Sequence, residues 1–527
     1  MVTKGTVSGI ISNIVTIVVD GPVFQNEICY ILLDDTRLMA EVIKVEGKQA
    51  FVQVFESTRG LKVGAIAEFT GRMLEVTLGP GMLSKNYDGL QNDLDKMDGV
   101  FLRRGQYTYP LDKESEWSFS PLVKIGDEVE SADWLGEVEE NHQKLKIMVP
   151  FNFKGKGVIK SIKQEGVYSI ETTIAVITDA EGKDHEVNMI QRWPVKIPML
   201  NYKEKPRPYK LLETGVRVID TLNPIVEGGT GFIPGAFGTG KTVLQHAISK
   251  QAEADIVIIA ACGERANEVV EIFAEFPNLI DPHTGRTLSE RTVIVANTSN
   301  MPVAAREASV YTAMTMAEFY RAMGLRVLLM ADSTSRWAQA LREISNRMEE
   351  LPGPDGFPMD LSSIISNFYG RAGHVVLNNG KEGSITFIGT VSPAGGNLKE
   401  PVTENTKKVA RCFYALEQRR ADMKRYPAVN PTESYSKYIE YPEFKEYIEK
   451  EINADWIPKV NEIRTRLQRG KEIAEQINIL GDDGVPTEYH VTFWKSELID
   501  FIILQQDAFD KVDAVTSLER QEAILNI

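Results

Sequence analysis

Hydrophobic and polar positions alternate in short runs over the N-terminal part of the chain, and these runs predict β-strands. Val, Ile and Thr are frequent in each run, and turn-forming pairs such as Asp20-Gly21, Asp34-Asp35 and Glu46-Gly47 separate them. The predicted strands are residues 6–19, 27–33, 37–45 and 49–55. Short, evenly spaced strands are typical of a small barrel. We therefore expect a β-barrel over residues 1–72.

A Gly- and Pro-rich stretch, residues 78–81, ends this pattern. We expect residues 73–110 to begin a second domain, and residues 111–190 to form a β-rich insert that bulges from it. Within the insert, residues 123–129 resemble the hairpin that opens barrel-sandwich modules carrying biotin or lipoate. Such modules need an exposed Lys at a tight turn, and the predicted turn, residues 137–140, contains none. We interpret the insert as structural.

The pattern changes again after a Pro-rich connector, residues 194–209. Apolar runs of strand length now alternate with segments of helical period, as in βαβ units around a parallel sheet. The predicted strands are residues 256–261, 292–296, 327–331 and 385–391, and the predicted helices are residues 243–253, 268–274, 304–323 and 336–348. We expect residues 191–430 to form an α/β core.

Strand patterns disappear after Pro427, and helical periodicity remains. The predicted helices are residues 443–450, 458–476, 495–501 and 509–526. We expect residues 431–527 to form a C-terminal helical domain. The fold class is therefore multidomain α/β, with an N-terminal β-barrel, a β-rich insert and a helical end, and a chain of 527 residues has room for these parts.

Composition excludes several classes of protein. The chain has 59 Lys and Arg against 74 Asp and Glu, and its net charge of −15 opposes attraction of the whole molecule to nucleic acid or anionic lipid. Its 3 cysteines are widely spaced, which predicts no disulfide framework or zinc ribbon and favours a reducing compartment. We find no apolar run of the roughly 18 residues that a membrane helix needs.

The clearest chemical signal is Gly235-Ala236-Phe237-Gly238-Thr239-Gly240-Lys241-Thr242, a complete GxxxxGK[ST] sequence. Glycines in such a loop let backbone N–H groups converge on phosphate oxygens, where a Cβ would obstruct them. We expect Lys241 to reach the β- and γ-phosphates and the Thr242 hydroxyl to bind Mg²⁺ directly. The helix expected from Val243 directs its positive dipole end at the same phosphates. The sequence therefore predicts a site for a nucleoside triphosphate.

Two predicted strands end in acidic residues. The run 327–331 leads into Asp332, which we expect to hold Mg²⁺ through water. The run 255–262 leads into Gly263-Glu264-Arg265, where a carboxylate can orient an attacking water and an arginine can neutralise phosphate charge. Glu264 and Arg265 can also form a structural ion pair or cap the next helix. Their position alone leaves both interpretations open.

Three further features are ambiguous in sequence. Tyr426, before Pro427, either stacks on a purine or belongs to the core. We interpret Cys262 as a buried thiol. A basic cluster nearby is either a phosphate-binding patch or a solvated helix face, and it comprises Arg419, Arg420, Lys424 and Arg425.

The order of these motifs resembles that of the catalytic A subunit of V-type and archaeal A-type rotary ATPases. Longer stretches carry the resemblance, which covers essentially the whole chain, including an insert that F-type β subunits lack. The matching stretches are residues 297–309, 331–338, 341–345, 391–393, 400–403 and 504–509. The resemblance implies a RecA-like P-loop NTPase core that binds ATP or ADP with Mg²⁺. It also implies that Glu264 is the general base, that Arg265 contacts the γ-phosphate and that Tyr426 stacks on adenine.

The resemblance further implies a place in a larger assembly. Three A subunits would alternate with three non-catalytic B subunits, and each B subunit would supply an arginine finger in trans. The ring would surround a central stalk, and the insert would face the peripheral stalks. The chain would lie on the cytoplasmic side of a membrane as a peripheral subunit, meeting the membrane sector only indirectly. Its chemistry would be ATP hydrolysis or synthesis coupled to transport of protons or sodium ions.

The chain departs from the family pattern at several positions. Residues 81–89 differ from the usual approach sequence, Gln339 stands where an acidic residue is common, and Ala394 where Pro is common. The chain ends at Ile527, within a predicted helix, whereas relatives usually continue through further helices. We therefore expect a C-terminal domain that is either naturally short or incomplete.

Other ring-forming ATPases are the alternatives. A type III secretion ATPase would lack the large insert. A nucleic-acid translocase would need a basic, aromatic surface, so we expect no nucleic-acid partner, because acidic residues offset the basic ones in the predicted barrel: Asp20, Glu27, Asp34, Asp35, Glu41, Glu46 and Glu56. A non-catalytic nucleotide-binding subunit would have no need of a water-activating carboxylate such as Glu264.

Overall fold

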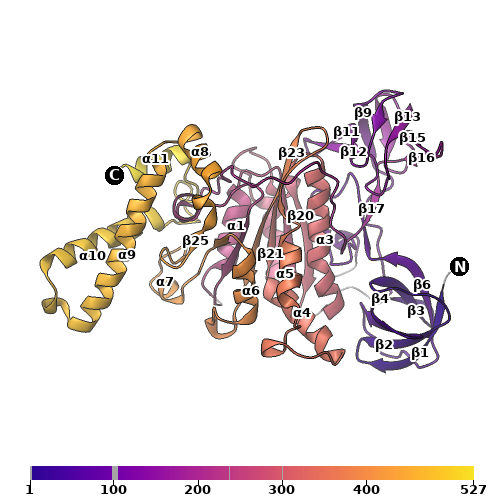
Figure 1. Ribbon diagram of the computed structural model, residues 1–527, viewed down its shortest axis with the longest axis horizontal. Coiled ribbons are helices and arrows are strands. Elements are labelled where there is room, and N and C mark those ends of the chain that lie inside the picture. Colours follow the sequence, from indigo (N-terminus) through magenta and orange to yellow (C-terminus); the bar gives the residue numbers. More distant parts are fainter. Residues whose placement is uncertain (1–2, 98–104, 237, 300) are drawn as a thin grey trace.

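The computed structural model describes residues 3–97, 105–236, 238–299 and 301–527. Figure 1 shows an elongated molecule with the N-terminal barrel and the insert at one end and the C-terminal helices at the other. A mixed sheet covered by helices lies between them. Among the described residues, no helix combines the length and the apolar character that crossing a membrane requires.

The N-terminal domain is a closed barrel with strand order β1-β2-β5-β4-β3-β6, which confirms the predicted barrel. Its strands are β1 (Lys4–Ile11), β2 (Ile14–Val19), β3 (Glu27–Leu33), β4 (Thr36–Glu46), β5 (Gln49–Val54) and β6 (Ile66–Met73). The single strand predicted over residues 6–19 is wrong, because a tight turn divides it into β1 and β2. Ser12 in this turn has a φ of 57°, and Ile11 pairs with Ile14 across it. The sequence pattern also missed β6.

The insert consists of two antiparallel sheets, with strand orders β10-β13-β15-β16 and β12-β11-β9-β14. The strands are β9 (Glu116–Pro121), β10 (Glu128–Val129), β11 (Trp134–Glu140), β12 (Gln143–Met148), β13 (Gly157–Ile162), β14 (Gly166–Ser169), β15 (Ala175–Asp179) and β16 (Asp184–Val187). The turn predicted at residues 137–140 is wrong, since these residues belong to β11. The turn follows at Asn141 and His142, which both have positive φ. After the insert, β17 (Gln191–Pro194) pairs with β7 (Glu75–Leu78), a strand that precedes the insert in sequence. The two ends of the insert therefore lie close together.

The central domain contains the predicted parallel sheet, with strand order β24-β18-β23-β21-β19-β20-β8, and β25 extends it antiparallel to β24. Its strands are β8 (Asn86–Tyr87), β18 (Thr230–Pro234), β19 (Ile256–Glu264), β20 (Thr292–Thr298), β21 (Arg326–Asp332), β23 (Glu382–Val391), β24 (Cys412–Phe413) and β25 (Tyr435–Ser436), with β22 (Gly373–Val376) paired to β23. The helices are α1 (Lys241–Gln251), α2 (Ala266–Glu275), α3 (Val303–Ala322), α4 (Thr334–Arg347), α5 (Leu361–Tyr369), α6 (Pro401–Val409) and α7 (Gln418–Asp422).

Helices cover both faces of this sheet. Alternate residues of β19 point to opposite faces, as the pleat of a strand requires. Ile258 and Ala260 belong to the buried cluster that contains α3 residues, whereas Ile259 and Ala261 belong to the cluster that contains α2 residues. Because both faces are buried, the strand is apolar throughout rather than alternating, which is the pattern that predicted it.

The C-terminal domain contains α8 (Pro442–Glu451), α9 (Trp456–Leu480), α10 (Thr487–Ile499) and α11 (Leu518–Leu525). Figure 1 shows α9 and α10 as a helical hairpin that extends away from the central sheet. The helix predicted over residues 509–526 is wrong in its first half. Asp507 and Asp510 there accept hydrogen bonds of 2.8–2.9 Å from backbone N–H groups two residues ahead, and such local bonds compete with helix formation.

Two of the four residues of the basic cluster, Arg420 and Arg425, have a structural role that neither alternative described, whereas Arg419 and Lys424 are exposed. Arg420 is buried and donates to both carboxylate oxygens of Asp500, at 2.7 and 2.9 Å. Arg425 donates to Asp500 at 2.7 Å and to Glu497 at 2.7 Å. These ion pairs fasten the segment around α7 to the end of α10.

Candidate nucleotide-binding site

The predicted site residues lie together at the carboxyl ends of neighbouring parallel strands. The loop after β18 leads into α1, β19 ends at Glu264, and β21, which pairs with β19, ends at Asp332. This edge is where open parallel α/β sheets bind ligands. A cleft of about 1780 Å³ opens there, lined by Lys241, Thr242, Glu264, Arg265 and Asp332. The fold thus gathers side chains that lie nearly a hundred residues apart in sequence.

The conformation of the loop before α1 requires glycine. Gly238 and Gly240 have φ angles of 83° and 85°, in the left-handed region that disfavours other residues. A Cβ on Gly235 would lie 2.7 Å from the Thr239 hydroxyl, which itself donates a 2.8 Å hydrogen bond to a loop carbonyl. Phe237 lies outside the described residues. The loop residues that line the cleft are Ala236, Gly238, Gly240, Lys241, Thr242 and Val243.

Lys241 begins α1 and points back into the loop. Its Nζ donates to the carbonyl oxygen of Gly235 at 2.8 Å and to the hydroxyl of Ser392 at 2.6 Å. Burial lowers the pKa of Lys241, and the nearby carboxylates of Asp332 and Glu264 oppose this shift. The structure therefore holds an ammonium group at the N-terminus of a helix, where the dipole and the backbone N–H groups also favour anions.

Glu264 and Asp332 form an acidic pair beside this cation. Burial, together with repulsion from Asp332 and Glu268, raises the pKa of Glu264 to about 8. Burial also raises the pKa of Asp332, although a 2.6 Å hydrogen bond from Thr390 opposes the change. Two carboxyl groups held close together in a buried site make the cleft receptive to positive charge.

These residues fit a magnesium ion by the chemistry of their donor atoms. Hydroxyl and carboxylate oxygens are the hard ligands that Mg²⁺ prefers, and Thr242 and Asp332 supply one of each. A second cavity, of about 20 Å³, adjoins the cleft and is lined by Thr242, Glu264 and Asp332. Such a volume accommodates a water molecule, as a metal bound partly through water needs.

Aromatic side chains also line the cleft. Tyr426, Phe501 and Phe509 line it, and Tyr426 and Phe509 are 42% and 86% exposed. Tyr426 is therefore not a core residue, which removes one of its two interpretations. A Cβ on Gly240 would lie 3.5 Å from its ring, so the ring lies beside the phosphate-binding loop. Exposed aromatic rings that line a cleft suit stacking against a flat ligand.

Sequence reasoning missed several residues of the cleft. Phe509 was not recognised as a residue of the cleft because its segment has helical periodicity and was therefore expected to be a helix. Arg306 and Arg336 also line the cleft, and nothing in their spacing marked them. Gly263 has a φ of 77°, and a Cβ there would lie 2.9 Å from the Arg306 side chain, so glycine at this position lets the arginine approach.

The two residues on either side of Gly263–Glu264 have different environments. Cys262 is buried, and burial raises the pKa of its thiol to about 12. It is a buried thiol, as predicted, and remains protonated at neutral pH. Arg265 occupies the N-cap position of α2, and its exposed side chain lines the cleft next to Glu264.

Family models match successive parts of the chain. The beta-barrel domain of the ATP synthase alpha/beta family matches residues 7–71, and the ATP synthase alpha/beta subunit barrel-sandwich domain matches residues 108–196. The nucleotide-binding domain of the ATP synthase alpha/beta family matches residues 215–436. The C-terminal domain of V and A type ATP synthase matches residues 445–527.

Curated relatives match over the whole chain. The V-type ATP synthase alpha chain of Borrelia garinii subsp. bavariensis is 50% identical over 530 residues, which span 100% of this chain and 90% of the relative. That of Treponema denticola is 50% identical over 528 residues, spanning 100% and 87%. That of Borreliella afzelii is 49% identical over 530 residues, spanning 100% and 90%. The chain therefore belongs to the V-type ATP synthase alpha chains of the ATP synthase alpha/beta family.

Proposed function

We propose that this chain is the catalytic subunit of a rotary ion-translocating ATPase, and that it binds Mg-ATP in the cleft between Lys241 and Tyr426. Membership of the V-type ATP synthase alpha chains supplies the reaction class, which is ATP hydrolysis or synthesis coupled to ion transport. The observation that carries the proposal is the composition of one cleft. It is lined by a loop lysine, a hydroxyl, two carboxylates and aromatic rings.

The loop residues bind the phosphates in this mechanism. Backbone N–H groups of the loop and of the first turn of α1 donate to phosphate oxygens. The Lys241 ammonium exchanges its bonds to Gly235 and Ser392 for bonds to the β- and γ-phosphates. Thr242 would bind Mg²⁺ directly, and Asp332 would bind it through water. The ion supplies positive charge against the phosphate oxygens.

Glu264 aligns the water that attacks the γ-phosphate. Its carboxylate accepts a hydrogen bond from the water and takes up a proton as the new P–O bond forms. It must be ionised to do so. Its pKa in the empty cleft is raised to about 8, with the charge of Arg336 opposing the rise, and the positive charge of Mg²⁺ would lower it. Arg265, next to it, contacts the γ-phosphate and neutralises the charge that develops there.

Substitution of Asp332 tests the proposed magnesium site. Asparagine at this position would keep the shape of the side chain but lose its negative charge, so D332N is expected to weaken Mg²⁺ binding about tenfold. The measurement is the dissociation constant of ADP, by titration calorimetry, with and without Mg²⁺. The wild-type chain should gain affinity when Mg²⁺ is added, and D332N should lose most of that gain. An equal gain in both would remove Asp332 from the metal site.

Substitution of Tyr426 tests the base end of the cleft. Y426A is expected to raise the dissociation constant of ADP about tenfold, because base–aromatic stacking is worth roughly 1–3 kcal/mol. Pyrophosphate has no base, so its affinity should stay within about twofold. Y426F keeps the ring and serves as the matched control, with affinity near that of wild type. If Y426A binds ADP as tightly as Y426F does, the ring does not stack on the base.

V-type ATP synthases are membrane-associated complexes of several subunits, and this chain is part of such a complex. We propose three copies alternating with three non-catalytic B subunits, each giving an arginine finger to the site in trans, around a central stalk and braced by peripheral stalks. Large apolar side chains exposed on the α9–α10 hairpin support contact with another subunit, and they include Ile479, Leu480 and Trp494. The match to the C-terminal domain of V and A type ATP synthases favours this assembly over a type III secretion ATPase or a nucleic-acid translocase.

A further inference from the structure

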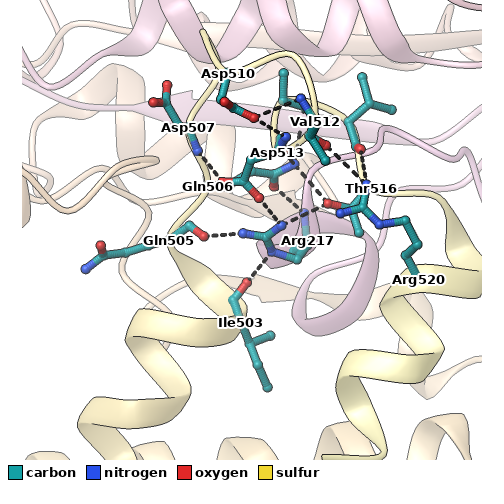
Figure 2. A network of polar contacts seen from close by, with 12 residues as sticks. Arg217, Ile503, Gln505, Gln506, Asp507, Asp510, Val512, Asp513, Thr516 and Arg520 are labelled. Atoms are coloured by element: carbon teal, nitrogen blue, oxygen red, sulfur yellow. Dashed lines mark hydrogen bonds and ion pairs between the residues drawn. The ribbon is translucent and has the colours of Figure 1, made fainter.

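A buried arginine connects the C-terminal domain to the side of the cleft. Arg217 precedes the short π-helical turn Val218–Leu222 and is 5% exposed. Figure 2 shows its guanidinium group pointing into the segment between α10 and α11, residues 505–516. From residue 509 on, this segment overlaps the first half of the predicted helix 509–526, where that prediction is wrong. Arg217 and several residues of the segment line the same cleft as Tyr426.

The guanidinium group of Arg217 bonds to four different groups of the C-terminal domain. Its Nε donates to the carbonyl oxygen of Ile503 at 2.8 Å. Its Nη1 donates to the carboxylate of Asp513 at 2.6 Å and to the hydroxyl of Thr516 at 2.9 Å. Its Nη2 donates to the carbonyl oxygen of Gln505. A planar fork of donors matches this arrangement, and the single ammonium of a lysine does not.

Gln506 links this network to Tyr426. Its side-chain oxygen accepts a 2.9 Å hydrogen bond from the backbone N–H of Arg217, and its Nε2 donates to the carbonyl oxygens of Gly215 and Asp513, both at 2.8 Å. Its own backbone N–H donates to the carbonyl oxygen of Tyr426 at 2.9 Å. The position of the aromatic end of the cleft therefore depends on the same bonds that hold the segment.

Polar bonds, rather than apolar packing, hold the middle of the segment. Phe509 is 86% exposed and Val512 is 66% exposed, so neither anchors it in a core. Asp513 instead accepts a 2.7 Å bond from the backbone N–H of Asp507, and Arg520 donates to the carbonyl oxygen of Val512 at 3.1 Å. Figure 2 shows that Asp513 also accepts a bond from Arg217, which links the two sets of contacts. The bonds of the Arg217 side chain to Gln505, Asp513 and Thr516 are therefore among the contacts that keep the segment against the cleft.

We propose that Arg217 is a positioning residue for nucleotide binding, which holds residues 505–514 in place beside Tyr426 at the base end of the cleft. The inference rests on the proposed nucleotide-binding function and adds to it a residue that contacts neither the phosphates nor the metal. Pre-ordering matters because apparent affinity falls in proportion to the fraction of molecules whose site is competent. If loss of the network leaves the segment in place for one molecule in ten, the dissociation constant rises about tenfold.

The test compares two ligands that use different ends of the cleft. The dissociation constants of ADP and pyrophosphate, each with Mg²⁺, are measured by titration calorimetry on the 527-residue chain. R217K keeps the charge and loses the fork, and D513A removes the carboxylate partner from the segment side. Both are expected to raise the dissociation constant of ADP about tenfold or more and to leave that of pyrophosphate within about twofold.

A matched control separates positioning from general docking of the domains. Arg464, on α9, donates to the carbonyl oxygen of Leu222 at the end of the same π-helical turn, but it does not line the cleft. R464K should therefore leave both affinities unchanged. Thermal unfolding of each variant shows whether it is folded. If R217K does not fold, the ADP and pyrophosphate affinities of D513A alone test the positioning role.

The outcomes are distinct. ADP affinity that is unchanged in the folded variants would overturn the inference, and so would an equal loss of ADP and pyrophosphate affinity, or an equal loss of ADP affinity in R464K. If the wild-type chain binds neither ligand, the nucleotide-binding function itself fails. A loss confined to ADP and to the variants of Arg217 and Asp513 supports the positioning role.

Discussion

Replacing Glu264 with glutamine is expected to lower the ATP hydrolysis rate of the assembled complex about 10³-fold, within the range that general base catalysis contributes. Glutamine has nearly the same shape as glutamate and can still hydrogen-bond a water molecule. It cannot take up the proton that the attacking water releases. Affinity for ATP should change by less than about threefold, because the phosphates are bound by other groups of the cleft. The measurement is steady-state turnover of the complex, with ATP affinity determined separately.

A control on the same helix makes the result specific. Glu271 lies on the exposed side of α2 and does not line the cleft, so E271Q should turn over at the wild-type rate. Turnover near the wild-type rate in E264Q would remove Glu264 from the mechanism. Equal losses in E264Q and E271Q would point instead to a disturbed subunit contact around α2.

Replacing Lys241 with alanine is expected to raise the dissociation constant of ATP about 10³-fold, equivalent to roughly 4 kcal/mol. The reason is that removing one partner of a buried ionic contact costs about 3–5 kcal/mol. In the empty site, Lys241 donates hydrogen bonds to a neutral carbonyl oxygen and a neutral hydroxyl, and Asp332, whose pKa the lysine charge lowers, keeps its hydrogen bond from Thr390 when Lys241 is removed. The fold should tolerate the change. The measurement is equilibrium binding of Mg-ATP to the chain.

Lys250 provides the matched control, since it lies in the last turn of the same helix α1. K250A removes a lysine of equal charge from the far end of the helix and should bind ATP like the wild type. If K241A also binds ATP normally, the loop does not bind the phosphates as proposed. If both variants lose affinity, the net charge of the region, rather than the position of Lys241, governs binding.

Local patterns predicted the phosphate end of the site and its sheet. The loop before Lys241 and the strand that ends at Asp332 each depend on residues adjacent in sequence, because glycine spacing and a buried apolar run determine their conformation. Helical periodicity predicted α1, α2, α3 and α4 of the core but missed α5 and α6. The resemblance to a known family added an aromatic role for Tyr426, which local patterns had left open.

Features that depend on distant contacts could not be predicted in this way. Residues 509–526 have helical periodicity, but in their first half an aspartate side chain bonds to the local backbone, and Arg217, nearly three hundred residues earlier, bonds to Asp513. The turn at Ser12 divides what looked like one strand. Arg420 looked like a surface cation, and its burial depends on Asp500. For the segment and for Arg420 the deciding partner lies outside the window that a sequence pattern uses, whereas the turn at Ser12 is a local feature within an apolar run.

Ion uptake and ATP hydrolysis, measured together in sealed vesicles that contain the purified complex, test the central claim most directly. The complex is prepared with either the wild-type chain or E264Q, and uptake is driven by added Mg-ATP. The account predicts that the wild-type complex hydrolyses ATP and takes up ions, and that E264Q loses both activities together although it still binds ATP. Hydrolysis and uptake at the wild-type rate in E264Q would contradict it, because the catalytic site would then lie elsewhere in the complex.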